Sequence, residues 1–266
     1  MAGPDDIGEE DALAVLTAVL LTPARFPAVL GDDFPAACAA LGLPPRSVGY
    51  GLVLGQDSAG ARWTVAVDDV SLVAVAVAAW DCGLEHGLSP GPDTVVTALP
   101  GWPLPLALAA PGRPAPHDPA GTGGAPLLRA PDARGWSPAR RRLGADEIAL
   151  RWAEWRGRIQ EAPLRPDPGT AARRPPLSHP GLRRALEEAD GYTRSMPPAG
   201  RVRSAFAPGG ARMLRADGPG WSLVARTDDM ALVLLDEEPG EVLPVPRGPR
   251  LPALLAALDA MATHPD

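Results

Sequence analysis

The chain has 266 residues, which allows one large domain or two small ones. Its formal net charge of −7 argues against general affinity for nucleic acid. All 25 Lys and Arg positions are Arg, because the sequence contains no Lys. A Walker phosphate loop is therefore excluded, since that motif needs a Lys. We expect neither a nucleic-acid partner nor a cofactor.

Cysteine usage and apolar runs indicate the compartment. Cys38 and Cys82 both lie in apolar settings, where a free Cys is commonly a small core residue. Met1–Asp11 is acidic and does not match a signal peptide, and the longest apolar run, Val70–Trp80, is too short to cross a bilayer. Together with the Ala, Arg, Pro and Gly bias of a G+C-rich genome, these features favour a bacterial, cytoplasmic protein with no membrane partner.

The first two predicted elements are helices. Glu9–Leu21 places its leucines at helical spacing, behind acidic residues that suit the positive end of a helix. Pro23 ends this helix. Asp33 or Asp32 can provide the N-cap of a short second helix that runs to Leu41.

The next stretch, about Val48–Ala79, predicts an antiparallel meander of three strands. Asp and Gly residues in Gln56–Gly60 suit the first turn, and the middle strand begins at Trp63. The acidic pair Asp68-Asp69 then forms the second turn, and Val70–Val73 forms the third strand.

Three weaker elements follow the first meander. Asp93–Leu99 is predicted as a short helix. Trp102–Leu108 is predicted as an extended apolar segment, because its prolines cannot donate to a strand ladder. Pro111–Pro138 is rich in Pro, Gly, Ala and Arg and lacks the β-branched residues of a core, so we predict a disordered linker.

The strongest single helix prediction is Asp146–Glu161. One narrow stripe carries its apolar residues at offsets of four, three and four: Ile148, Trp152, Trp155 and Ile159. We expect this stripe to dock on the chain's own sheet, because a soluble monomer rarely exposes such a patch. The alternative is that the helix binds another protein, and its candidate binding residues are then Trp152, Trp155, Arg151 and Arg158.

The C-terminal part repeats the plan of the first meander. After a short helix at Gly181–Ala189, Val202–Leu235 reads as strand, turn, strand from Trp221, acidic turn and strand. The apolar segment Val242–Val245 follows, and an apolar-faced helix at Leu251–Ala262 completes this part. Trp221 should be a core anchor that shares its face with alternate residues of its strand.

These elements predict an α+β fold of two antiparallel β-meanders with packed helices, and the similarity of the meanders suggests a pseudo-two-fold repeat. The predicted domain limits are 1–110 for the N-terminal α+β half, 111–144 for the disordered linker, 145–190 for the central helical segment and 191–266 for the C-terminal meander and helix.

Catalytic and metal-binding motifs are weak. Ser89 lies in a Gly-x-Ser-x-Gly spelling, but no strand enters it directly and prolines follow it, contrary to a nucleophile elbow. His86 lies near Cys82, yet sequence adjacency does not set catalytic geometry. No histidine spacing matches a zinc motif. The acidic pairs Asp68-Asp69 and Asp228-Asp229 are interpreted as solvated turns and not as metal ligands.

The sequence therefore favours a non-enzymatic protein-binding adaptor, chaperone or regulatory protein with an unidentified protein partner. One alternative is a small hydrolase or transferase that uses Cys82 or Ser89 with His86. Another is an antitoxin or immunity-type inhibitor with an acidic surface. The charge distribution is compatible with such an inhibitor. Residues 129–184 carry 13 Arg against six acidic residues, so the remainder of the chain is strongly acidic.

Overall fold

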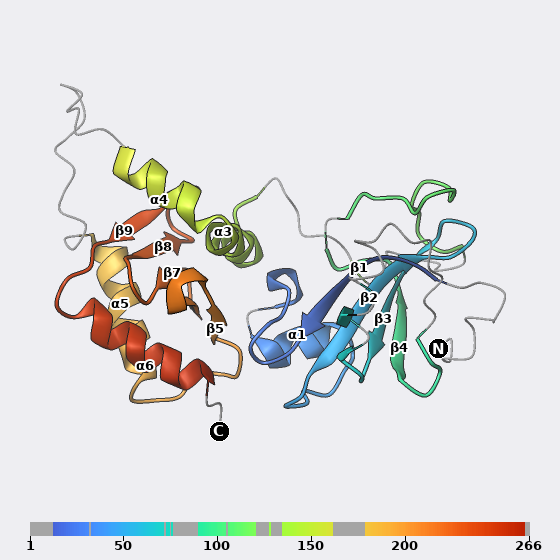
Figure 1. The fold of residues 1–266 in the computed structure, drawn as a ribbon, viewed down its shortest axis with the longest axis horizontal. Helices are drawn as coiled ribbons and strands as arrows, with labels where there is room; N and C mark the ends of the chain where they lie inside the picture. The colour runs from blue at the N-terminus through green and yellow to red at the C-terminus, as the bar shows by residue number, and fades with distance from the viewer. Residues whose placement is uncertain are drawn as a thin grey trace. The chain divides into compact units, whose positions relative to one another are not determined.

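The computed structural model describes residues 13–31, 33–71, 73–74, 76, 90–104, 106–120, 128, 135–161 and 179–263. The chain divides into two compact units, Met1–Asp132 and Ala133–Asp266. Each unit contains one antiparallel sheet, and helices accompany both sheets (Figure 1). The predicted α+β class with two antiparallel sheets is confirmed.

The sheet of the first unit has four strands in the order β1-β2-β3-β4, with every neighbouring pair antiparallel. The strands are β1 (Ala14–Leu21), β2 (Tyr50–Gln56), β3 (Arg62–Val67) and β4 (Val95–Pro100). Helix α1 (Phe34–Ala40) joins β1 to β2. One apolar cluster includes side chains of α1 and the segment after β4, and a second includes the opposite face of the sheet.

The helix predicted at Glu9–Leu21 is wrong, because the described part of this stretch is strand β1. Leu16 and Leu21 belong to the cluster that includes α1, whereas Val15 and Ala18 belong to the cluster on the other face. A strand buried on both faces reads as a continuous apolar run, and such a run cannot be separated from a buried helix by periodicity.

The helix predicted at Asp93–Leu99 is also wrong. Thr94 precedes strand β4, whose β-branched residues suit a pleated and half-buried surface. The third strand predicted at Val70–Val73 is absent, because the described residues Ser71, Val73, Ala74 and Ala76 are helical. Strand β4 therefore occupies the sheet position beside β3 that we assigned to that segment.

The short helix with Asp33 as its N-cap is confirmed. The Asp33 carboxylate accepts a hydrogen bond from the Ala36 N–H at 2.8 Å, and α1 starts at the next residue after the cap. Cys38 is buried on this helix, and its burial raises the pKa of the thiol to about 11. The Cys38 thiol is therefore a core group and not a thiolate nucleophile.

The first described part of the predicted linker is ordered against the sheet, so the disorder prediction is wrong there. The buried Gln56 side chain accepts from the Ala110 N–H at 2.6 Å and donates to the Pro114 carbonyl at 3.4 Å. A His117 ring nitrogen contacts the Ala59 carbonyl at 2.9 Å. These hydrogen bonds hold the segment against the sheet, although its Pro- and Gly-rich sequence has few apolar side chains to bury. Residues 121–127 and 129–134 lie outside the described part.

The sheet of the second unit has five strands in the order β5-β6-β7-β8-β9, again antiparallel throughout. They are β5 (Val202–Phe206), β6 (Arg212–Gly218), β7 (Trp221–Arg226), β8 (Ala231–Leu235) and β9 (Leu243–Val245). The helices are α3 (Pro138–Leu150), α4 (Trp152–Glu161), α5 (Pro180–Tyr192) and α6 (Leu251–Thr263). The second meander and the two C-terminal helices are confirmed.

This five-stranded sheet is covered on both faces (Figure 1). Alternate residues of β7, among them Trp221, Leu223 and Ala225, form a core with α5 and α6. The residue between two of them, Val224, packs with Ile148 of α3 on the other face. The two-residue side-chain period of a strand produces this division.

The predicted central helix begins earlier than expected and is broken in the middle. Ser137 caps α3, because its hydroxyl accepts a hydrogen bond from the Arg140 N–H, so α3 contains residues that we had assigned to the linker. At Arg151 the backbone leaves helical geometry, with φ −114° and ψ 37°, and α4 begins at the next residue. The segment 135–161 groups with the C-terminal unit.

The predicted repeat is not confirmed. After Asp68-Asp69 the chain enters a helical segment, whereas after Asp228-Asp229 it enters strand β8. The sheets also differ in strand number. The two hairpins that begin at Trp63 and Trp221 in the sequence are thus similar in composition, but a helical segment follows the first acidic pair and a strand follows the second.

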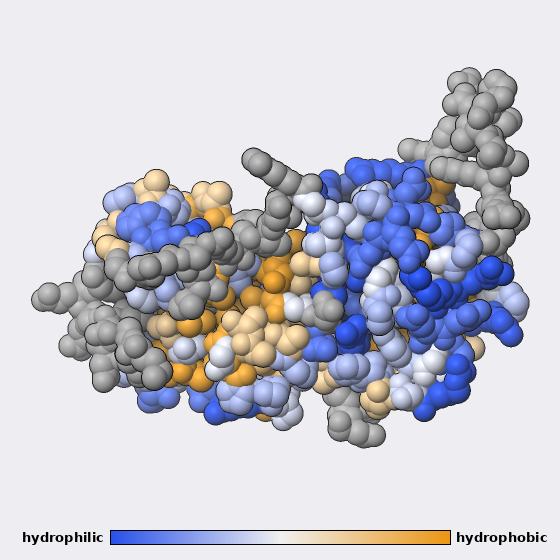
Figure 2. Space-filling model, turned by 180° about the vertical axis from the view of Figure 1, so that it is seen from behind, coloured by the Kyte–Doolittle hydropathy of each residue, from blue (hydrophilic) through white to orange (hydrophobic). Residues whose placement is uncertain are grey.

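The surface of the two units differs in the view of Figure 2. Hydrophobic residues gather on the side of the first unit that faces the viewer, whereas the second unit is mainly hydrophilic there (Figure 2). Within the described part of the chain, no helix combines the length and hydrophobicity needed to cross a membrane.

Candidate functional site

The stripe predicted on the central helix packs on the chain's own sheet, as expected. Ile148 and Trp152 are buried in one cluster with side chains of β7 and β8. Trp155 and Ile159 are partly buried against the same cluster. Trp152 is 7% exposed, so it is a core residue and has little surface to offer a partner.

The other three candidate binding residues lie nearer to solvent. Arg151 is exposed and pairs with Glu147 at 3.2 Å and with Glu154 at 2.8 Å. The exposed Arg158 guanidinium lies over the Trp155 ring, 4.9 Å from its centroid. Trp155 and Arg158 therefore contact each other near the surface, whereas Trp152 is buried.

We expect Trp152→Ala to destabilise the protein more than Trp155→Ala. The buried ring of Trp152 would leave a cavity, with a loss near the lower end of the range of about 3–5 kcal/mol for buried aromatic residues. Trp155 is only partly buried and its neighbours retain more of their contacts. Thermal unfolding followed by circular dichroism measures both losses. Equal losses would contradict the difference in packing.

The candidate catalytic residues Cys82, Ser89 and His86 lie outside the described residues. The acidic turns are described, and they make local contacts. Asp69 accepts hydrogen bonds from Ser71, and Asp228 pairs with Arg226 at 2.7 Å. Among the residues that the structure describes, no group of three or more His, Cys, Asp or Glu is placed to hold a metal ion.

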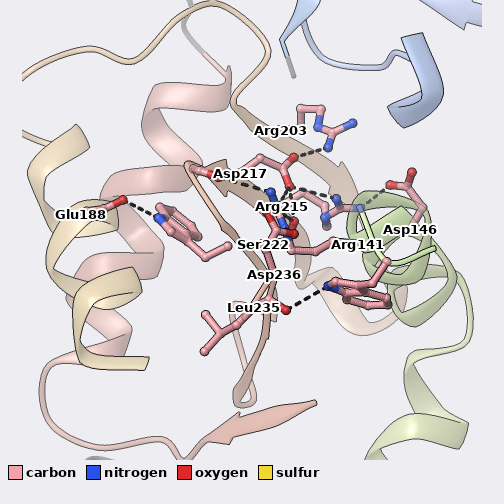
Figure 3. Close-up of polar contacts among 12 residues, drawn as sticks. Arg141, Asp146, Glu188, Arg203, Arg215, Asp217, Ser222, Leu235 and Asp236 are labelled. Carbon is pink, nitrogen blue, oxygen red and sulfur yellow. Dashed lines mark hydrogen bonds and ion pairs between the residues drawn. The ribbon is translucent and has the colours of Figure 1, made fainter. Parts of the chain in front are cut away.

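The most concentrated polar arrangement lies between α3 and the second sheet and is centred on Asp217 (Figure 3). The Asp217 carboxylate is fully buried. It accepts hydrogen bonds from the Arg203 guanidinium at 2.6 Å and from the Ser222 hydroxyl at 2.5 Å. Arg215 donates to it at 3.5 Å and also pairs with Asp146 of α3. We call these residues, with Arg141 and Asp236, the Asp217 network.

Arg141 connects α3 to this network. Its Nε donates to Asp236 at 2.7 Å, and its Nη1 donates to the Ser222 hydroxyl, which in turn donates to Asp217 (Figure 3). A third donor, Nη2, points to the Gly218 carbonyl at 3.5 Å. A single fully buried guanidinium therefore links the helix to β6, β7 and the end of β8.

The electrostatics of the network explain why a carboxylate persists in the core. Burial alone would raise the pKa of Asp217, because it penalises the charged form. The charges of Arg215 and Arg203 and the Ser222 hydrogen bond outweigh burial, and they hold the pKa of Asp217 well below its usual value. Asp217 is therefore an ionised internal counter-charge for the buried arginines.

The Asp217 network is not among the sites predicted from the sequence. The Asp and Gly residues before Trp221 are typical of a turn, but β6 extends to Gly218 and places Asp217 inside the sheet. Arg141 lies within the predicted linker. One signal was present, because Arg215 and Asp217 alternate on a strand and must share a face. Their partner Arg141 is remote in sequence, so no local pattern identifies the ion pair.

The network's role is structural, because the Asp217 and Asp236 carboxylates pair with arginine and serine side chains of the same unit. Comparison with protein-family models, with curated proteins and with solved structures gives no match to this chain. The surface pair Trp155 and Arg158 is therefore the arrangement on which a functional proposal rests.

Proposed function

We propose that this chain is a non-enzymatic, cytoplasmic protein-binding protein of the adaptor, chaperone or regulatory type, and that α4 carries its contact surface. The observation that carries the proposal is the Arg158 guanidinium stacked on the Trp155 ring at 4.9 Å. Trp and Arg are enriched among the residues that dominate binding energy at protein interfaces.

The charges around this pair support a role at the surface. Neighbouring arginines are used within the unit, since Arg151 pairs with two glutamates and Arg156 pairs with Asp229. Arg158 makes no ion pair with any carboxylate whose side chain the structure describes. Its charge is thus available to a carboxylate of a partner, while the ring of Trp155 offers an apolar surface beside it.

Leu150 is a second exposed apolar residue, close in sequence to α4. It is the last residue of α3, and it is 86% exposed. A scattered exposed leucine needs no explanation, but this one lies at the break from which α4 starts. The expected partner is a protein segment that presents an acidic side chain next to aliphatic groups.

We expect Arg158→Ala to weaken partner binding by about 2 kcal/mol, roughly thirtyfold in Kd, without changing stability. The side chain is exposed, so its loss leaves the core intact. The partner is first captured with a photo-crosslinking residue at the exposed position Glu154, which lies one helical turn before Arg158 on the same face of α4. It is then identified by mass spectrometry and titrated by calorimetry. Arg194→Ala is the matched control, because that exposed arginine lies just after α5 and pairs with Asp190 of that helix.

Two results would contradict this proposal. Equal affinity of the wild type and of Arg158→Ala for the partner would show that α4 is not the contact surface. The absence of any specific crosslink from position 154 in a cell extract would rule out the partner itself. Loss of binding in Arg158→Ala with retention in Arg194→Ala supports the proposal.

A further inference from the structure

One edge of the second sheet is open to strand pairing. Among the residues that the structure describes, β5 pairs with β6 alone, because it is the first strand in the sheet order. The opposite edge, β9, has three residues and contains Pro244, which cannot donate to a further strand. Strand β5 has five residues and neither Pro nor Gly. Of the two edges of this sheet, only β5 is suited to accept another strand.

The hydrogen bonds at its two ends show which backbone groups of β5 face outward. The Ala207 N–H donates to the Ala211 carbonyl at 3.0 Å, and the Asp217 N–H donates to the Arg201 carbonyl at 2.9 Å. In an antiparallel ladder the bonded pairs alternate, so Arg203 also faces β6. The backbone N–H and C=O groups of Val202, Ser204 and Phe206 therefore point away from the sheet.

The side chain of Phe206 is exposed at the end of this edge. It is 90% exposed, although the Arg212 guanidinium lies 4.4 Å from its ring centroid. Val202 and Ser204 share its face, since Val202 belongs to the core with α6 and Ser204 bonds to Asp259 of α6. A strand added at β5 would cover the exposed ring.

The sequence of β5 complements itself in the antiparallel direction. In a pair centred on Ser204, Phe206 of each copy lies opposite Val202 of the other, and Arg203 lies opposite Ala205. Aromatic residues opposite β-branched residues stabilise sheets, and directly opposed like charges destabilise them. This register pairs every Phe206 with a Val202 and opposes no two arginines. The outward groups at 202, 204 and 206 then form bonded pairs throughout.

We propose that the protein forms a two-fold homodimer through antiparallel pairing of β5 with β5 of a second copy, which joins the two five-stranded sheets. The interface is isologous, because the same strand contributes both sides. It is independent of the α4 surface. Five residues on each side make a small interface, so the dimer dissociates on dilution.

Sedimentation velocity of the full chain over a range of concentrations tests the dimer, and Phe206→Glu is the decisive variant. It places a charge opposite Val202 of the second copy, and we expect dimerisation to weaken by more than about tenfold in Kd. Phe206 is exposed, so the variant should keep the wild-type melting temperature. Met196→Glu is the matched control, because Met196 is 60% exposed in the same unit but lies outside the strand.

Hydrogen exchange tests the register independently. The amides of Ser204 and Phe206 should be protected at high protein concentration and lose this protection on dilution or in Phe206→Glu. A chain that stays monomeric at all concentrations overturns the proposal. A dimer that survives Phe206→Glu, or whose β5 amides exchange freely, overturns it equally.

Discussion

Replacement of Asp217 by Asn is expected to destabilise the second unit by about 3–5 kcal/mol. The neutral amide would keep the shape of the side chain, but Arg203, Arg215 and Arg141 would lose their fully buried counter-charge. Removal of one member of a buried ion network leaves uncompensated charge, which costs more than the network itself contributes. The unfolding free energy from hydrogen exchange of the β7 amides measures the loss in the intact chain.

Two further variants separate charge from packing. Asp190→Asn removes an exposed carboxylate of α5 that pairs with Arg194, and it should cost no more than about 1 kcal/mol. Asp217→Leu combined with Arg203→Met removes both charges of the closest pair and should cost less than Asp217→Asn. A double variant that is less stable than Asp217→Asn would show that the ion pair itself stabilises the unit.

Low pH should destabilise the second unit through protonation of the Asp217 carboxylate. The pKa of Asp217 is lowered in the folded state, so its contribution is complete above the unfolded pKa of about 3.9 and declines as the pH falls toward the folded value. The stability of the wild type should therefore decrease more steeply below about pH 4 than the stability of Asp217→Asn. Parallel curves would indicate that Asp217 does not titrate with folding.

Local chemistry made part of this fold predictable. The Asp33 cap, the strand that begins at Trp221 and the stripe from Ile148 each depend on residues within one element. Strands β1 and β4 were assigned to helices because apolar runs on doubly buried or short strands lack a distinguishing period. Their identity is set by neighbours in the sheet, which a single sequence does not display.

The polar features were harder to predict because their meaning depends on distant partners. Arg141 resembles Arg158 in the sequence, yet one is fully buried beside Asp217 and the other is exposed on α4. Trp152 and Trp155 lie on the same stripe in the sequence. Only the structure shows that Trp152 is buried against the sheet and that Trp155 is partly exposed. The Trp155 and Arg158 pair was thus predictable as a candidate, whereas the Asp217 network was not.

Trp221→Ala is expected to destabilise the second unit by about 3–5 kcal/mol, because the indole is fully buried between the sheet and α5. Its ring centroid lies 5.9 Å from that of Tyr192. Its Nε1 donates to the Glu188 carboxylate at 2.6 Å, so the loss includes a charge-assisted hydrogen bond. Trp221→Phe should cost less, since it keeps most of the ring and removes the donor. Met196→Ala at an exposed position should change stability by less than about 0.5 kcal/mol.

Gly218, which pairs with Trp221 across β6 and β7, gives a second test of the same packing. A Cβ atom at Gly218 would lie 2.2 Å from the indole, and the enclosed ring has no room to retreat. Gly218→Ala should therefore destabilise by about 1–3 kcal/mol in the wild type and by clearly less in the Trp221→Ala background. Because the two residues touch, their effects must be coupled. Additive losses in the double variant, measured by urea unfolding, would show that the indole does not fill the space over Gly218.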